Sequence, residues 1–246
     1  MMWALKSRRA VTPEIMDQAG IGQAEHLQAL RGLRRINSFS NTAEQMLAPI
    51  FAMARAEQLT RLRLLDVACG GGDVPIGIAL AARQKGLEID LTLLDRSLTA
   101  VNRAVEAARD VRITCQGIQG DVLDGLPNCS ADVVTNSLFL HHVPEESQVV
   151  SLIRSMGELA RRMVVISDLA RSRAGYFAAV VGCRLLSRSW IVHHDGPASV
   201  RAAWTIEELA DFASRAGMSN ARVTPTWPRR MLLVWRRPGE GGHASA

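Results

Sequence analysis

The chain is poor in aromatic residues and almost free of lysine. Of its 246 residues only 4% are Phe, Trp or Tyr, and Lys6 and Lys85 are the only lysines, so arginine carries nearly all of the positive charge behind the net +5. The arginines stand singly or in pairs and form no long basic run. A groove for single-stranded nucleic acid combines continuous basic charge with aromatic stacking platforms. The composition therefore argues against nucleic acid as a partner.

Cysteine pairs and long apolar runs are also missing. The four cysteines form no C-x-x-C pair and no Cys/His cluster with zinc spacing, which predicts no metal site and a reducing compartment. The amino terminus has no apolar core of a signal peptide, and no apolar run reaches the ~18 residues of a spanning helix. We therefore expect a cytoplasmic protein with no membrane span.

From residue 63 onward, strand-like and helix-like segments alternate, which predicts a parallel α/β sheet. The expected strands are residues 64–67, 89–94, 111–115, 132–136, 163–167, 221–224 and 231–235, and the expected helices are 75–85, 98–108, 144–160 and 205–216. Thr205 with Glu208 matches a capping box at the last helix. The short link at 226–229 permits only an antiparallel return of the final strand.

Two further segments flank this pattern. Residues 14–60 look helical, with a break at 37–42 where Asn41 or Thr42 is expected to cap the second helix. Residues 169–203 form a long insertion with a helix-like stretch near 176–186. We expect an α/β, Rossmann-like, seven-stranded, mostly parallel sheet with an antiparallel last strand and helices on both faces. The expected divisions are a helical extension or lid over 1–61, a domain over 62–240 with its helical cap insertion, and a flexible tail over 241–246.

The most informative stretch is Leu64 to Asp73, a buried strand that ends in an acid and enters a glycine turn before a helix. A phosphate-binding P-loop needs Gly-Lys-Ser/Thr, which is missing. A dinucleotide fingerprint needs a third glycine, where Pro75 stands. S-adenosylmethionine (SAM) carries no phosphate but has a sulfonium and an ammonium group, so a carboxylate such as Asp66 suits it. The turn therefore favours a SAM site.

The run Leu-Asp-Val-Ala-Cys-Gly-Gly-Gly-Asp resembles motif I of the class I SAM-dependent methyltransferases, especially their quinone-biosynthesis branch. The resemblance covers about residues 62–236. It implies SAM as cofactor, with ligand groups at the carboxyl ends of successive strands. The implied contacts are Asp66 to the methionyl ammonium, the backbone at Ala68, Gly70 and Gly72, Asp95 to the ribose, Arg96 over the adenine, Asp121 and Val122 at the adenine, and Asn136 and Ser137 along the methionine portion.

No single general base is specified by the sequence. Methylation of a phenol requires loss of its proton, for which histidine is suited at neutral pH. The candidates are His142, preferred over its neighbour by position, His193 and His194 on an expected strand beside Asp195, and Asp168 at the end of the fifth strand. Transfer by proximity alone, with no dedicated base, stays open.

The apolar content of the extension and the insertion suggests a hydrophobic or aromatic small-molecule acceptor. The resemblance to quinone and polyketide methyltransferases implies O-methylation of a phenolic hydroxyl, with methylation of ring carbon as the next choice. An RNA or protein methyltransferase and a non-catalytic SAM-binding module are the alternatives. The sequence predicts no oligomeric state.

Overall fold

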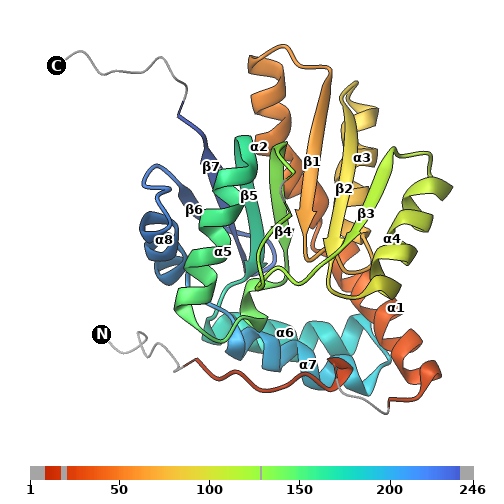
Figure 1. Cartoon of the computed structure of the whole chain (residues 1–246). Helices are drawn as coiled ribbons and strands as arrows, with labels where there is room; N and C mark the ends of the chain where they lie inside the picture. Colours follow the sequence, from red (N-terminus) through yellow and green to blue (C-terminus); the bar gives the residue numbers. More distant parts are fainter. Residues whose placement is uncertain (1–8, 18–20, 128, 239–246) are drawn as a thin grey trace.

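The structure is a computed structural model that describes residues 9–17, 21–127 and 129–238. Its centre is a seven-stranded sheet in the order β3-β2-β1-β4-β5-β7-β6 (Figure 1). The strands are β1 (Arg61–Val67), β2 (Glu88–Asp95), β3 (Cys115–Gln119), β4 (Ala131–Ser137), β5 (Ala160–Leu169), β6 (Arg222–Thr226) and β7 (Arg230–Arg236). The helices are η1 (Ile15–Asp17), α1 (Gln23–Phe39), α2 (Thr42–Ala56), α3 (Asp73–Gln84), α4 (Leu98–Asp110), η2 (Leu140–His142), α5 (Glu146–Leu159), α6 (Arg173–Leu186), α7 (Trp190–Ala202) and α8 (Ile206–Arg215).

The sheet is parallel except at β7, which runs antiparallel to both β5 and β6. This confirms the predicted seven strands and the reversed last strand. The chain passes from β1 outward through β2 to β3 and then returns to β4 on the other side of β1. In open α/β sheets, ligands bind beyond the carboxyl ends of the strands at such a switch point. The fold therefore places any cofactor crevice beyond the ends of β1 and β4.

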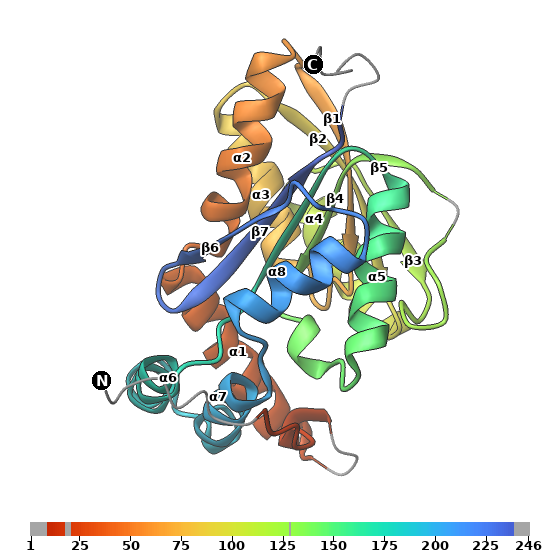
Figure 2. The ribbon, with the colours of Figure 1, turned by 90° about the vertical axis from the view of Figure 1, so that its left-hand side faces the viewer.

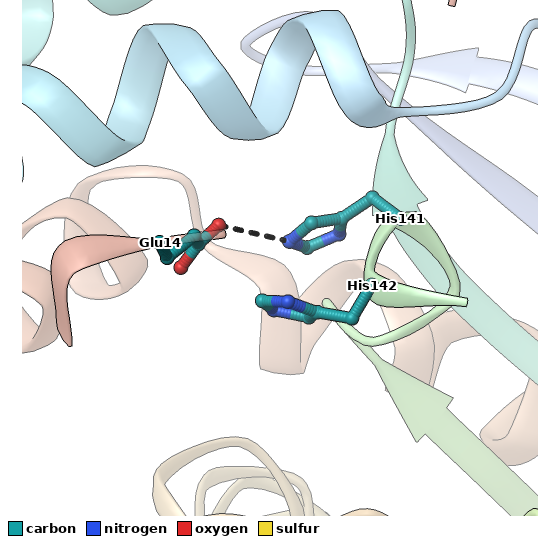
Figure 3. Close-up of side chains that lie close together, drawn as sticks. All are labelled: Glu14, His141 and His142. Atoms are coloured by element: carbon teal, nitrogen blue, oxygen red, sulfur yellow. Dashed lines mark ion pairs between the residues drawn. The ribbon is translucent and has the colours of Figure 1, made fainter. Parts of the chain in front are cut away.

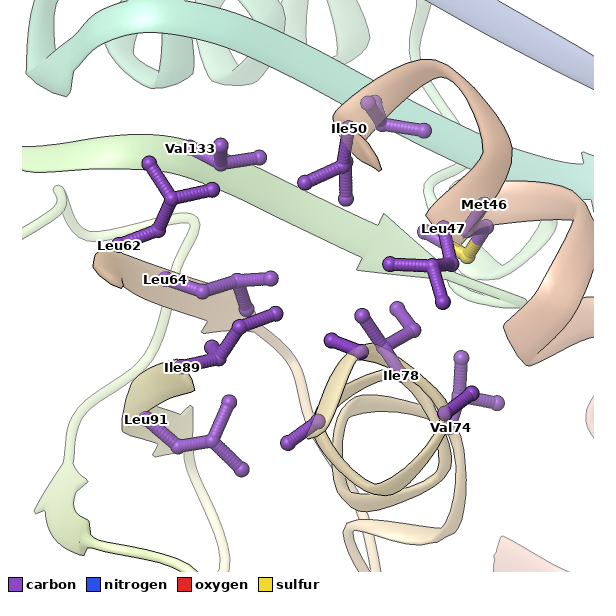
Figure 4. Close-up of a cluster of buried hydrophobic side chains, with 14 of the residues drawn as sticks. Met46, Leu47, Ile50, Leu62, Leu64, Val74, Ile78, Ile89, Leu91 and Val133 are labelled. Atoms are coloured by element: carbon purple, nitrogen blue, oxygen red, sulfur yellow. The ribbon is translucent and has the colours of Figure 1, made fainter. Parts of the chain in front are cut away.

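Two hydrophobic layers hold the sheet between its helices. On one face, residues of α2 and α3, including Met46, Leu47 and Ile78, pack on Leu64 and Val133 of the strands (Figure 4). On the other face, α5 and α8 cover the sheet (Figure 2) with Phe212 and other fully buried side chains. Burial of apolar surface at roughly 25 cal/mol per Å² is the main force that stabilises such a sandwich.

The cap is formed by α1, α6 and α7, which lie beyond the carboxyl ends of the parallel strands (Figure 1). A small apolar cluster of Ala29, Cys183, Ile191 and Val192 joins these helices. The expected N-terminal lid is thus divided in space, because α2 belongs to the main sandwich, whereas η1 and α1 pack with α6 and α7. The domain boundaries stay predictions, and the tail at 241–246 lies outside the described residues. No helix among the described residues is long and apolar enough to cross a bilayer.

Several local expectations were wrong. The third strand is β3 and not 111–115, because α4 extends to Asp110 and Arg112 turns the chain with a positive φ of 58°. His193 and His194, expected on one strand, lie in helix α7. Asn41 adopts a left-handed conformation and makes no side-chain cap. The capping box of Thr205 and Glu208 is confirmed.

Candidate active site

The loop after β1 is built around residues with positive φ. Ala68, Gly70 and Gly72 have φ of 57°, 52° and 78°. A Cβ atom on Gly72 would lie 2.8 Å from the Cβ of Ala104 on α4, so this glycine is required for packing. A Cβ on Gly70 or Gly71 would meet no atom within 4 Å. The backbone of these two residues therefore faces open space that a ligand can enter.

Asp66 is the buried acid beneath this loop. Its Oδ1 accepts a hydrogen bond of 2.5 Å from the Thr135 hydroxyl, whereas its Oδ2 is buried with no partner. Burial, opposed by the Thr135 bond and reinforced by Asp95, raises the pKa of Asp66 to about 7. An unpartnered buried carboxylate oxygen is costly unless a donor or cation reaches it. The methionyl ammonium of SAM, directly or through water, suits this oxygen.

Asp95 connects the first two loops of the sheet. Its Oδ2 accepts from the backbone N–H of Gly70 at 2.8 Å, and its Oδ1 accepts from that of Ser97 at 2.9 Å. The carboxylate is therefore fixed at the lip of the glycine loop with lone pairs still available. This placement suits the expected bond to the ribose hydroxyls. Arg96 follows it, and its carbonyl accepts a bond from Gln119.

The remaining expected cofactor residues lie at the ends of β3 and β4. Asp121 accepts from the N–H of Leu123 at 2.9 Å in a tight turn, and Val122 is buried beside it. Asn136 donates to the Val67 carbonyl at 2.7 Å, and its own Oδ1 is buried without a partner. Ser137 lies opposite Ser167 in the register of β4 and β5. The fold thus gathers the expected residues at one sheet edge, and their geometry fits SAM. Their individual contacts stay predictions.

A histidine and an aspartate pair at the ends of β4 and β5. The Nδ1 atom of His141, on η2, lies 2.7 Å from Oδ1 of Asp168 on β5, and both side chains are buried. Asp168 also accepts backbone N–H bonds from His141 and Leu169. Burial alone would lower the pKa of His141, but Asp168 and Glu14 outweigh it and raise that pKa. Burial alone would raise the pKa of Asp168, and His141 instead brings it below its usual range. The pair is therefore stabilised as an ion pair.

Glu14 completes the cluster from the amino-terminal segment. Its Oε1 lies 3.9 Å from Nε2 of His141 (Figure 3), whereas Asp168 bonds the other ring nitrogen, Nδ1. The ring of His142 lies against that of His141, with 4.2 Å between centroids and a tilt of 35° between the planes. Desolvation and the neighbouring His141 lower the pKa of His142 to about 4. Ligand atoms of Glu14, His141 and His142 all lie within 4.8 Å of one another, so the three residues could also hold a metal ion.

The other expected bases occupy different surroundings. His193 Nε2 bonds the Ser187 carbonyl at 2.8 Å, and His194 Nδ1 lies 3.0 Å from Asp195, with its side chain 54% exposed. Both histidines are on helix α7 and not on a strand. Asp195 accepts bonds from the N–H groups of Ile15 and Met16, so it holds the segment that carries Glu14.

Sequence reasoning missed His141 and Glu14. His142 was preferred by position, whereas in the 3-10 turn Leu140–His142 it is His141 that pairs with Asp168. The adjacent pair of histidines was the available sequence signal for His141. Glu14 carried no local signal at all, since only the folded chain brings it to the end of β4.

Comparisons with known proteins agree with this geometry. A family model described as "Methyltransferase domain" matches residues 60–174. A ubiquinone biosynthesis O-methyltransferase of Paraburkholderia phymatum is 30% identical over 167 residues, which are 67% of this chain and 68% of that protein. One of Ralstonia nicotianae is 31% identical over 170 residues, 65% of this chain and 64% of that protein. The chain thus spans about two thirds of the length of these relatives.

Solved structures share the fold. Magnesium protoporphyrin IX methyltransferase of Synechocystis with bound S-adenosylhomocysteine (SAH) superposes with a TM-score of 0.57 at 19% identity, over 91% of each chain. An O-methyltransferase of neocarzinostatin biosynthesis, in complex with SAH and 1,4-dihydroxy-2-naphthoic acid, gives 0.51 at 18% identity over 70% of this chain and 48% of that one. Motif, fold and relatives agree, and the chain belongs to the class I SAM-dependent methyltransferases.

Proposed function

We propose that this enzyme methylates the hydroxyl of a phenolic, hydrophobic small molecule, such as a polyketide or quinone precursor. The observation that carries the proposal is the buried pair of His141 and Asp168 at the same sheet edge as the glycine loop. A phenol has a pKa near 10, so a positioned base assists its attack at neutral pH.

SAM, when bound, supplies an electrophilic methyl group on a sulfonium. When His141 is neutral, a proton on Nδ1 donates to Asp168, and Nε2 is then the proton acceptor. In this proposal Nε2 takes the proton of the acceptor hydroxyl, and Asp168 stabilises the imidazolium that forms. Glu14, on the Nε2 side, lies where the acceptor hydroxyl would approach, so it shares that space with the acceptor.

The cofactor contacts belong to the same proposal. Asp66 and Asn136 each offer a buried oxygen without a partner, and Gly70 and Gly71 offer open backbone. Asp95 sits at the lip of the loop where ribose hydroxyls would lie. The adenine would lie by Arg96, Asp121 and Val122. Ala68 and Ser137 line the strand ends beside these groups.

The acceptor class is supported by the relatives. The curated relatives are named as ubiquinone biosynthesis O-methyltransferases, and one structural neighbour holds a dihydroxynaphthoic acid. These names favour a small-molecule acceptor over RNA or protein, and turnover over a purely binding role. The four cysteines are free thiols, which supports a cytoplasmic location as part of the proposal.

The test is a turnover assay with SAM and a panel of catechols, dihydroxynaphthoates and alkylated phenols, with the product identified by mass spectrometry and NMR. We expect a methyl ether and a rate that falls about 10²-fold or more in His141→Asn, as for loss of a general base. SAH binding, followed by calorimetry, should stay within about threefold in this variant. Methylation at ring carbon would contradict the O-methyl assignment, and SAH binding without turnover of any phenol would indicate a binding module.

A further inference from the structure

The outer face of helix α6 is apolar and uncovered. Phe177, Val181 and Leu185 follow one another at four-residue steps and are 67%, 56% and 79% exposed. Residues at i, i+4 and i+8 share one face of a helix. Ala174 and Ala178, which are also exposed, lie beside them on this face. Among the described residues nothing covers this apolar stripe of α6.

Exposure on this scale is not needed to hold the cap together. The buried residues of α6 are Gly175 and Cys183, and Cys183 belongs to the small cluster shared with α1 and α7. The helix therefore packs inward through a narrow side and turns its large apolar side chains outward. Contiguous apolar surface of this kind marks an interaction site.

The segment that carries the stripe has charge of one sign. Residues 170–194 contain four arginines and no acid. Arg171 is buried and paired with Glu208, whereas Arg173, Arg184 and Arg188 are exposed at the two ends of α6. The neighbouring acid Glu25 accepts a bond from the indole of Trp190, itself 52% exposed at the start of α7. An apolar face framed by arginine is typical of helices that lie in the plane of an anionic lipid surface.

We propose that α6 docks this protein on a membrane surface that contains anionic lipid. Phe177, Val181 and Leu185 enter the boundary between headgroups and acyl chains, and Arg173, Arg184 and Arg188 contact lipid phosphates. α6 lies at the margin of the molecule on the cap side (Figure 2). Docking through α6 therefore leaves the central sheet in water. This inference is independent of the proposed acceptor, because it rests on surface residues outside the active site.

The test is co-sedimentation of the full chain with vesicles of phosphatidylcholine containing about 30% phosphatidylglycerol, compared with pure phosphatidylcholine. We expect binding to the anionic vesicles at about 0.05 M salt, which weakens at about 0.5 M as the Debye length shrinks. The triple variant F177S/V181S/L185S should lower the partition coefficient about tenfold or more. Leu123→Ser, which removes another exposed apolar residue, is the matched control and should bind as wild type.

A second pair of variants tests the charges. R173E/R184E/R188E should abolish the preference for anionic vesicles, whereas R55E/R63E/R222E, which changes exposed arginines of α2, β1 and β6, should retain part of it. Circular dichroism should show an unchanged fold in all variants. Absence of binding to anionic vesicles at low salt would overturn the proposal. So would a wild-type dimer in light scattering that F177S/V181S/L185S converts to monomer, because the stripe would then cover a second copy of the chain.

Discussion

The guanidinium of Arg9 lies 3.6 Å from the centroid of the Trp204 ring, and its N–H groups donate hydrogen bonds to backbone carbonyls. It donates to the carbonyls of Ala202, Pro144 and Val143 at 2.6, 2.6 and 2.7 Å. These carbonyls belong to the end of α7 and to the loop that follows η2. Arg9 therefore anchors one end of the segment 9–17, and Asp195 anchors the other, with Glu14 between them.

Replacing Arg9 should loosen this segment. We expect Arg9→Ala to lower the free energy of unfolding by about 1–3 kcal/mol, because charge-assisted hydrogen bonds and a cation–π contact are lost together. Thermal or urea unfolding measures the change. Arg109→Ala, an exposed arginine of α4, is the control and should stay within about 0.5 kcal/mol of wild type. Equal effects of the two variants would show that the segment contributes little to stability.

The two neighbouring glycines of the loop should respond differently to alanine. Gly72→Ala should destabilise the fold, because its Cβ would clash with Ala104 and its φ of 78° disfavours a side chain. Gly71→Ala should keep the melting temperature, since its Cβ meets open space, yet weaken SAH binding about tenfold or more by filling that space. Differential scanning fluorimetry with and without SAH separates the two effects. SAH binding by Gly71→Ala at wild-type strength would place the ligand elsewhere.

Binding of SAM should release a proton near neutral pH. Burial raises the pKa of Asp66 to about 7, so the carboxyl is largely protonated at pH 6. An ammonium group brought to this oxygen favours the ionised form, and affinity should therefore rise as pH increases from 6 to 8. Calorimetry in buffers of different ionisation enthalpy measures the released proton. Asp66→Asn should remove the pH dependence; a slope that survives in this variant would assign it to another group.

The same carboxyl should also affect stability without ligand. An acid whose pKa is raised on folding binds more protons in the native than in the unfolded state between its two pKa values. The contribution of Asp66 to stability is therefore largest below about pH 4, falls as pH rises toward 7 and is constant above that. Asp66→Asn should be less sensitive to pH over this window in urea titrations. If the free energy of unfolding changed with pH equally in wild type and Asp66→Asn, the raised pKa of Asp66 would be contradicted.

The pH profile of turnover should report the pair of His141 and Asp168. Asp168 and Glu14 raise the pKa of His141 above 6.5, so the neutral base is recovered, and kcat/KM rises, only at pH above that value. Asp168→Asn should move the inflection to lower pH and reduce the rate about 10²–10⁴-fold, because the orienting carboxylate is lost. His194→Gln is the comparison and should keep the profile. If turnover were lost in His194→Gln and kept in Asp168→Asn, the general base would be His194 on α7.

Removal of metal should leave turnover unchanged. In the proposed mechanism Nε2 of His141 accepts a proton, which leaves no ligand role for the cluster with Glu14 and His142. Activity after dialysis against EDTA, with and without added Mg²⁺ or Zn²⁺, measures this directly. Loss of activity that a cation restores would show that the three residues act as metal ligands.

Much of the fold follows from local pattern. The alternation of strands and helices, the reversed β7 and the capping box at Thr205 were predicted because each depends on residues close together in the chain. The strand β3 was misplaced because it is an edge strand with largely exposed polar side chains, whereas Val111 and Ile113, which suggested a strand, follow the end of α4. Burial, and not strand formation, explains those two apolar residues.

The sequence by itself determined the cofactor class, since the acid and the glycine turn that resemble motif I are neighbours in one short segment. Only the tertiary structure decided which residues meet at the reacting edge. His141, Asp168 and Glu14 come from η2, from β5 and from the amino-terminal segment. Their encounter depends on the strand order and on the anchoring of a distant segment by Arg9 and Asp195. No spacing along the chain encodes contacts of that kind, because packing of the whole molecule sets them.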